Sequence, residues 1–185
     1  MKSISRIFAA AVVIVAGCTT ALQDGIRLGE TFGGPHGDKF SDLNRVSPGQ
    51  TVESITIRSA DRIDAVSLVV VDPWGVKDNL AHGGGGGDPN TLTLGADEHI
   101  IGVQAHWGKY YRKTRIMYIE FTTDQGNTIS GGTPTDNIGK EVAPDGYQLG
   151  GLVGYSDKEV DSLGPIWTII EPVESEGPYY QRDGK

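Results

Sequence analysis

The sequence predicts an all-β domain, and three observations support that prediction. Glycine accounts for 27 of 185 residues, roughly twice its usual share of about 7%. It is spread along the chain, as expected for short strands joined by tight turns. Apolar residues alternate over short stretches, and few windows of helix length show a 3.6-residue period. Finally, residues 59–66 and 156–163 match in residue type at every position, which indicates an internal repeat.

A secretory signal is predicted at residues 1–21. Lys2 and Arg6 precede an apolar run at residues 7–17, which is too short to span a bilayer as a helix. Two processing routes remain open. Residues 15–18 resemble the lipobox of bacterial lipoproteins, which would make Cys18 a lipidated N-terminus at the cell envelope. Cleavage after Ala21 would instead release a secreted protein. Cys18 is the only cysteine, so neither route leaves a disulfide within the chain.

The charge of the chain argues against nucleic acid as a partner. Lys2 and Arg6 lie in the signal, so its removal takes the formal net charge from −8 to −10. An acidic domain without a cluster of Lys and Arg repels phosphate backbones. Membrane contact is expected only through a lipid anchor at Cys18.

The first half of the domain is expected to contain a strand, a glycine turn closed by Phe40, and a hairpin. Ile55 and Ile57 alternate with polar residues on the ingoing strand of this hairpin, whereas the outgoing strand is apolar on both faces and is expected to be covered on both. The expected segments, in order, are a strand at 23–29, the glycine turn at 31–42, the hairpin strands at 52–58 and 63–71, and a strand at 76–80.

Five consecutive glycines follow at residues 83–87. They are costly to order, and strands continue on both sides, so a loop close to a ligand is favoured over a linker. The remaining strands are expected at 92–94, 100–105, 115–122, 128–130, 146–154 and 162–170. A third hairpin is placed at the turn 124–127. Three hairpin-centred units predict internal threefold pseudo-symmetry, and residues 173–185 read as a polar, unordered tail.

The repeated octet predicts a small polyol clamp. In each copy an apolar strand enters and another leaves, so the middle is a tight loop with outward-facing N–H groups and one aspartate at its exit, Asp64 or Asp161. An ionised aspartate that accepts two sugar hydroxyls makes charge-assisted hydrogen bonds.

The chain resembles the jacalin-related lectins over residues 24–171. Landmarks occur in the order of that family: the glycine motif at 33–40, the hairpin at 55–66, the segments at 82–94 and 98–103, the strand at 119–124, and the hairpin at 151–164. The resemblance implies a β-prism I fold of three four-stranded antiparallel sheets within a domain at 22–172. It also implies a carbohydrate-binding protein without catalysis or cofactors, which recognises mannose/glucose- or galactose-type glycans and gains avidity as a homodimer or on a clustered surface.

Carried over residue by residue, the resemblance implies two sugar sites. The main site comprises Gly37, Asp157, Lys158, Glu159 and Asp161. A second site comprises Asp61, Arg62, Asp64, Gly83 and Gly84. The leading glycine of the family's loop pattern is replaced by Asp157 in one copy and by Ala60 in the other. Because aspartate tolerates positive φ more readily than alanine, the loop with Asp161 is favoured.

Three other readings are weighed against the lectin. Glycoside hydrolysis needs two carboxylates that flank one bond, but Asp64 and Asp161 are expected on different sheets. The four histidines, at 36, 82, 99 and 106, lack metal-ligand spacing, and His82 is expected to bond within its glycine loop. Trp74, Trp107 and Trp167 are expected in the core or over a sheet, although residues 107–111 could form an aromatic loop that stacks on a glycan.

The chief rival is a secreted β-prism that has lost sugar binding and acts as a protein-interaction or structural surface module. The two replaced loop glycines favour it.

Overall fold

The computed structural model describes residues 22–171 as thirteen β-strands. No helix in this part of the chain is long and apolar enough to cross a membrane. The predicted signal, Cys18 and the predicted unordered tail lie outside the described residues. The strands are β1 (Ile26–Leu28), β2 (Phe32–Gly33), β3 (Asp38–Ser41), β4 (Thr51–Ser59), β5 (Ile63–Val71), β6 (Lys77–Gly83), β7 (Asp88–Thr93), β8 (Ile100–Tyr110), β9 (Lys113–Thr123), β10 (Thr128–Gly132), β11 (Asn137–Val142), β12 (Tyr147–Ser156) and β13 (Val160–Ile169).

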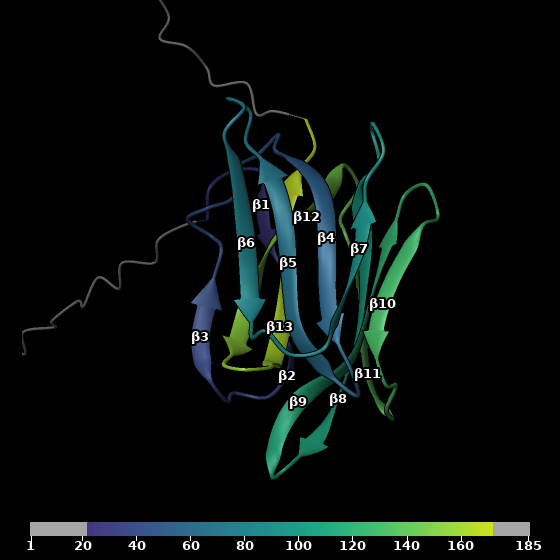
Figure 1. Ribbon diagram of the computed structural model, residues 1–185. Helices are drawn as coiled ribbons and strands as arrows, with labels where there is room; N and C mark the ends of the chain where they lie inside the picture. Colours follow the sequence, from purple (N-terminus) through teal and green to yellow (C-terminus); the bar gives the residue numbers. More distant parts are fainter. Residues whose placement is uncertain (1–21, 172–185) are drawn as a thin grey trace, which may run out of the picture.

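The strands form three antiparallel sheets around one core (Figure 1). The first sheet has the order β6-β5-β4-β7 and the second has the order β10-β9-β8-β11. The third has the order β1-β13-β12-β3, and the two-residue strand β2 also pairs with β13. A long hairpin therefore occupies the centre of every sheet, as the repeated octet predicts for two of them.

Both ends of the domain build the third sheet. β1 pairs with residues 166–168 of β13, and β2 pairs with Ser162 and Leu163 farther along the same strand. β1 and β2 are thus two pieces of one edge strand, which makes the third sheet the counterpart of the other two. The predicted all-β fold of three four-stranded antiparallel sheets is confirmed.

The register of the three central hairpins shows which positions are equivalent. Each hairpin contains two bulges, and the bulge nearer the turn leaves one residue unpaired, which is Asp64 in β5, Asp161 in β13 and Met117 in β9. A second set of equivalent contacts is a hydrogen bond from a neighbouring loop to the carbonyl of each bulged residue. Gly84 N–H donates to Asp64 at 2.9 Å, Gly34 N–H to Asp161 at 2.9 Å and Thr133 N–H to Met117 at 2.8 Å. The predicted threefold pseudo-symmetry is therefore present in the hydrogen bonding.

The third hairpin was predicted at the wrong turn. The turn at 124–127 does join β9 to β10, but the equivalent of the other two hairpins is β8–β9, which turns at Tyr111 and Arg112. Its bulged residue is Met117 rather than an aspartate. The repeat is invisible in the sequence here because the hairpin is longer and has lost the acidic residue.

Apolar side chains from all three sheets fill the core. Ile55, Leu68, Ile119, Phe121 and Trp167 are among those that are almost fully buried. Burial along β5 alternates, so its outer face is only half covered, contrary to the expectation of cover on both faces. β13 is the strand that is buried along nearly its whole length. Burial of apolar area stabilises the fold by roughly 25 cal/mol per Å². The packed core fixes the three central hairpins relative to one another and so positions their loops.

Candidate functional site

Four loops from two sheets meet at one end of the prism. They are the hairpin loops at 60–62 and 157–159 and the glycine loops at 33–37 and 83–87. The backbones touch at Gly84, where an added Cβ would lie 2.5 Å from the carbonyl oxygen of Lys158. Glycine at this position allows the first-sheet loop to approach the third-sheet loop. The structure therefore brings the two predicted sugar sites close to each other.

A bulge places each aspartate against its own glycine loop. Bulges re-aim a side chain relative to the regular ladder, and here they direct Asp64 towards Gly87 and Asp161 towards Gly37. A Cβ at Gly87 would lie 2.7 Å from Oδ2 of Asp64, and one at Gly37 would lie 2.8 Å from Oδ2 of Asp161. Both glycines have positive φ, +61° and +75°, so the two loops form the same close contact.

The carboxylate of Asp161 is buried, contrary to the expectation that it faces outward. Its exposed fraction is 0%, and the guanidinium of Arg115 forms an ion pair with it. Both carboxylate oxygens are covered by neighbouring atoms. Sequence reasoning could not foresee this arrangement because Arg115 comes from the second sheet.

Arg115 belongs to a charged cluster built from equivalent positions. The pairs Ser59–Ile63, Trp107–Ile116 and Ser156–Val160 are equivalent in the three hairpins. Arg62, Arg115 and Glu159 each come directly before the second member of one of these pairs. Glu159 forms ion pairs with both arginines: its Oε2 lies 2.6 Å from Nε of Arg115, and its Oε1 pairs with Arg62. The hydrogen bond from Arg62 is the first cause that lowers the pKa of Glu159, followed in the same direction by the charges of both arginines.

Asp64 lies in a more open environment than Asp161. It keeps an exposed fraction of 6%, and within residues 22–171 no Lys, Arg or His forms an ion pair with it. Burial raises the pKa of the Asp64 carboxyl, and the nearby charge of Arg62 opposes that shift. Asp64 is thus the aspartate of the pair whose charge no cation among the described residues neutralises in an ion pair.

Backbone N–H groups beside both aspartates remain available. The N–H of Ala60 donates to the Arg62 carbonyl at 3.2 Å, and that of Asp157 donates to the Glu159 carbonyl at 3.1 Å. Among the backbone bonds of the described residues, none uses the N–H groups of the two residues at the centre of either loop, which are Asp61 and Arg62 in one and Lys158 and Glu159 in the other.

The replaced leading glycines do not strain the loops. Only Asp97, Tyr111 and Arg112 have positive φ among the non-glycine residues described, so Ala60 and Asp157 adopt ordinary conformations. Gly83 does have positive φ, +106°, and a Cβ there would also collide with the Asp64 carbonyl, so this position requires glycine for both reasons. The sequence argument that favoured the Asp161 loop over the Asp64 loop therefore does not hold.

His82 and Trp74 lie elsewhere than the sequence suggested, whereas Trp107 packs against the core as expected. Nε2 of His82 lies 2.9 Å from Oδ2 of Asp42, outside the glycine loop, and its ring stacks on Phe40. Trp74 is 81% exposed in the β5–β6 turn, contrary to the expectation of a core or sheet-covering position. Trp107 stacks on Phe32 with ring centroids 5.9 Å apart, so it is a packing residue rather than an outward platform.

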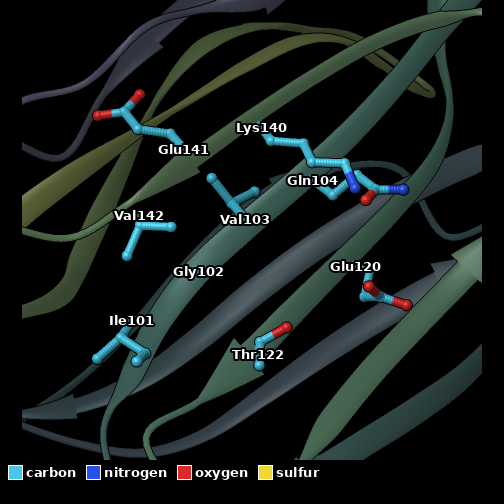
Figure 2. A pocket seen from close by; sticks show the side chains of 9 residues that line it. All are labelled: Ile101, Gly102, Val103, Gln104, Glu120, Thr122, Lys140, Glu141 and Val142. Carbon is cyan, nitrogen blue, oxygen red and sulfur yellow. The ribbon is translucent and has the colours of Figure 1, made fainter.

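A separate hollow of about 270 Å³ lies on the outer face of the second sheet, over β8, β9 and β11. Figure 2 shows its lining, in which Lys140 and Gln104 are cross-strand neighbours. None of the nine lining residues belongs to either predicted sugar site. Within residues 22–171, no group of three or more His, Cys, Asp or Glu side chains is placed to hold a metal ion.

Sequence reasoning missed Arg115 at this end of the prism, and it named Tyr110 and Gly87 only as members of the segments 107–111 and 83–87. The long β8–β9 hairpin brings in Arg115, and no local pattern marks that residue. A signal for Gly87 was present, because the segments at 33–38 and 83–88 have equal length and both end in Gly-Asp.

Comparisons with known proteins agree with this architecture. A family model described as the jacalin-like lectin domain matches residues 29–166. Secreted RxLR effector protein 19 of Plasmopara viticola is 28% identical over 160 residues, covering 84% of this chain and 88% of that protein.

Two solved structures share the fold. Malaysian banana lectin superposes with a TM-score of 0.69 at 21% identity, covering 78% of this chain and 99% of that one. A mannose binding jacalin related lectin from Ananas comosus gives 0.68 at 20% identity, with the same two coverages. With the family model spanning most of the described residues, this chain belongs to the jacalin-like lectin domain family and has its β-prism fold.

Proposed function

We propose that the protein is a non-catalytic lectin that binds a neutral mannose/glucose- or galactose-type sugar in the notch between the loops 60–64 and 83–87. We call this the Asp64 notch. The observation that carries the proposal is the state of Asp64, which sits against a glycine loop at an exposed end of the prism without an ion-pair partner in the described residues. The family and the mannose binding relative from Ananas comosus support the same ligand class.

The notch offers complementary groups to a sugar. The Asp64 carboxylate accepts hydrogen bonds from two neighbouring hydroxyls, and the N–H groups of Asp61 and Arg62 donate to sugar oxygens. Gly83 and Gly84 keep the glycine loop close enough to form the second wall. Hydrogen bonds to a charged group contribute about 1.5 to 3 kcal/mol each. Two or three in an open notch give weak affinity at a single site, so avidity through a homodimer or a clustered surface is part of the proposal.

We propose that the Asp161 loop is closed to sugar in this protein. Gly37 abuts Asp161 in the loop that also holds Asp157, Lys158 and Glu159, and Arg115 pairs with the Asp161 carboxylate that a sugar would need. A ligand could compete only by displacing a buried ion pair, and leaving one charge of such a pair unpaired costs several kcal/mol.

A glycan array on the purified protein tests the proposal. We expect binding by the wild type, loss of binding in Asp64→Asn, and retained binding in Asp161→Asn and Asp161→Ala. Asparagine keeps the size of aspartate but removes the charge, and circular dichroism confirms that each variant is folded. Loss of binding in Asp161→Asn with full binding in folded Asp64→Asn would move the site to the other loop.

A protein-interaction module without sugar binding is the second candidate. The observation in its favour is the sealed Asp161 carboxylate, and one relative of similar length carries the name of a secreted effector. Absence of signal from the wild type across the whole array would favour this candidate.

We also propose that the mature protein is secreted, with lipidation at Cys18 as the alternative. Residues 1–21 carry the features of a signal, and the Plasmopara viticola relative is named as secreted. Mass spectrometry of the mature N-terminus separates cleavage after Ala21 from a lipid-modified Cys18.

A further inference from the structure

The β8–β9 hairpin carries an extension that the other two hairpins lack. In the first and third sheets the loop follows directly after the pairs Ser59–Ile63 and Ser156–Val160. The equivalent pair in the second sheet is Trp107–Ile116, and three further pairs follow it before the turn. We call residues 108–115 the arm. Figure 1 shows the tip of this hairpin reaching past the other two hairpin loops at the lower end of the molecule.

The arm concentrates positive charge and exposed aromatic surface. No Asp or Glu occurs between Glu98 and Glu120, although the whole chain is acidic. Lys109, Arg112 and Lys113 are exposed on the arm, and Tyr111 at its tip is 85% exposed. The arm therefore combines three exposed cations with one exposed aromatic ring. The hairpin loops at 60–62 and 157–159 contain no aromatic residue.

The turn of the arm keeps large side chains in a conformation that disfavours them. Tyr111 and Arg112 have φ of +45° and +67°. A left-handed conformation is unfavourable for a residue with a Cβ, and this glycine-rich chain uses glycine at most of its other positions with positive φ. Side chains retained against such a cost indicate a role for the side chains themselves.

Two contacts fix the arm beside the Asp64 notch. The guanidinium of Arg62 lies 4.2 Å from the ring centroid of Tyr110, and Arg62 is two residues from Asp64. Arg115 at the base of the arm pairs with Glu159 in the neighbouring loop. Tyr110 also packs edge-on against Tyr111, with ring centroids 4.7 Å apart. A chain that leaves the notch over Arg62 thus meets Tyr110 and then the cations at the tip.

We propose that the arm is a second subsite that binds the acidic groups of a polyanionic glycan whose neutral end occupies the Asp64 notch. This inference rests on the proposed function for the identity of the notch. Asp61 and Asp157 are exposed on the neighbouring loops and repel acidic groups near the notch, where Lys158 is the exposed cation. The arm carries three exposed cations and no carboxylate, so it attracts acidic groups more strongly. Tyr111 supplies a face for ring stacking, and the three cations pair with carboxylate or sulfate groups.

Binding to oligosaccharides of defined charge tests the proposal. The probes are oligogalacturonate, a heparin-derived oligosaccharide and neutral mannan oligosaccharide, measured by surface plasmon resonance at low and high salt. The first two probes distinguish carboxylate from sulfate as the source of charge. The arm variant is Lys109→Gln/Arg112→Gln/Lys113→Gln, and Tyr111→Ser tests stacking. The control variant removes three exposed cations elsewhere, as Arg27→Gln/Lys77→Gln/Lys140→Gln.

We expect the arm variant to bind at least one polyanion about tenfold more weakly than the wild type, with a reduced dependence on salt. Tyr111→Ser should weaken the same interaction about fivefold. The control variant has the same net charge as the arm variant and should keep most of the binding. Monomeric galacturonic acid should gain nothing from the arm, because a single sugar cannot reach both subsites.

Equal losses in the arm and control variants, or none in either, would overturn the subsite. Stronger binding to vesicles of phosphatidylserine and phosphatidylcholine than to any oligosaccharide, with the same dependence on the arm, would overturn the assignment to a glycan. The two hypotheses fail separately. If Asp64→Asn abolishes mannan binding while the arm variant leaves polyanion binding unchanged, the subsite is wrong and the proposed function stands. If the wild type does not bind mannan, and Asp64→Asn does not change binding to any probe, the proposed function has failed.

Discussion

Replacing Arg115 with methionine tests how the prism end is closed. Methionine keeps a long, flexible apolar stem but removes the guanidinium that pairs with Glu159 and with the fully buried Asp161. Breaking a buried pair by removing one partner leaves an uncompensated charge, at a cost of about 3–5 kcal/mol. For a domain of this size each kcal/mol lowers Tm by about 2–4 °C, so we expect a loss of roughly 6–20 °C.

Thermal and urea unfolding of the wild type and Arg115→Met measure this cost. Lys113→Met is the matched control, because Lys113 lies two residues away on β9 and is exposed. A surface substitution of this kind stays within about 0.5 kcal/mol. The double variant Arg115→Met/Asp161→Asn should recover part of the loss, since Asp161 then leaves no unpaired charge.

The reasoning is refuted if Arg115→Met is as stable as Lys113→Met. That result would mean that the Asp161 carboxylate reaches water or another cation in solution, and the Asp161 loop would again be a candidate for sugar binding. The same variant gives a second reading on the glycan array, because removal of the guanidinium opens the carboxylate to ligand.

Three further predictions follow from the contacts at the prism end. Gly87→Ala should cost about 1–2 kcal/mol of stability and weaken sugar binding, because Gly87 has positive φ and abuts Asp64. Gly85→Ala is the control in the same denaturation and binding assays, since a Cβ added at Gly85 meets no atom within 4 Å. Sugar binding needs ionised Asp64, whose pKa is raised by burial, so titration calorimetry across pH should show binding lost on acidification with a midpoint above the usual carboxyl value. The pKa of Glu159 is lowered in the folded protein, so its ion pairs stabilise the fold above its unfolded pKa and lose this contribution as the pH falls through its folded pKa. Urea unfolding at several pH values should therefore show that Glu159→Gln loses less stability in acid than the wild type does.

The pattern of the sequence predicted the sheets well because it reflects local rules. Alternating apolar residues such as Ile55 and Ile57, and the repeated octet, predicted the hairpins of the first and third sheets. The hairpin of the second sheet was missed because its bulged position holds Met117 rather than an aspartate, and because its turn uses Tyr111 and Arg112 rather than a turn dipeptide such as Asn-Gly.

The sequence predicted those contacts of the candidate site that form within a single sheet, but not those between sheets. Gly37 and Asp161 do meet, and so do the glycine loop and Asp64, since each pair belongs to a single sheet. The choice between the two sites depended on Arg115, which reaches Asp161 from another sheet. No spacing within the sequence predicts a contact of that kind. Backbone tolerance alone favoured the loop whose aspartate is buried and paired with Arg115.

A nuclear magnetic resonance titration of the labelled protein with a binding monosaccharide, identified by the array, tests the central claim most directly. We predict that the amide signals of Asp61, Arg62 and residues 83–87 shift on titration, while those of residues 157–159 stay in place. Shifts confined to residues 157–159 and Gly37 would contradict the account, since the ligand would then occupy the loop that Arg115 is said to close.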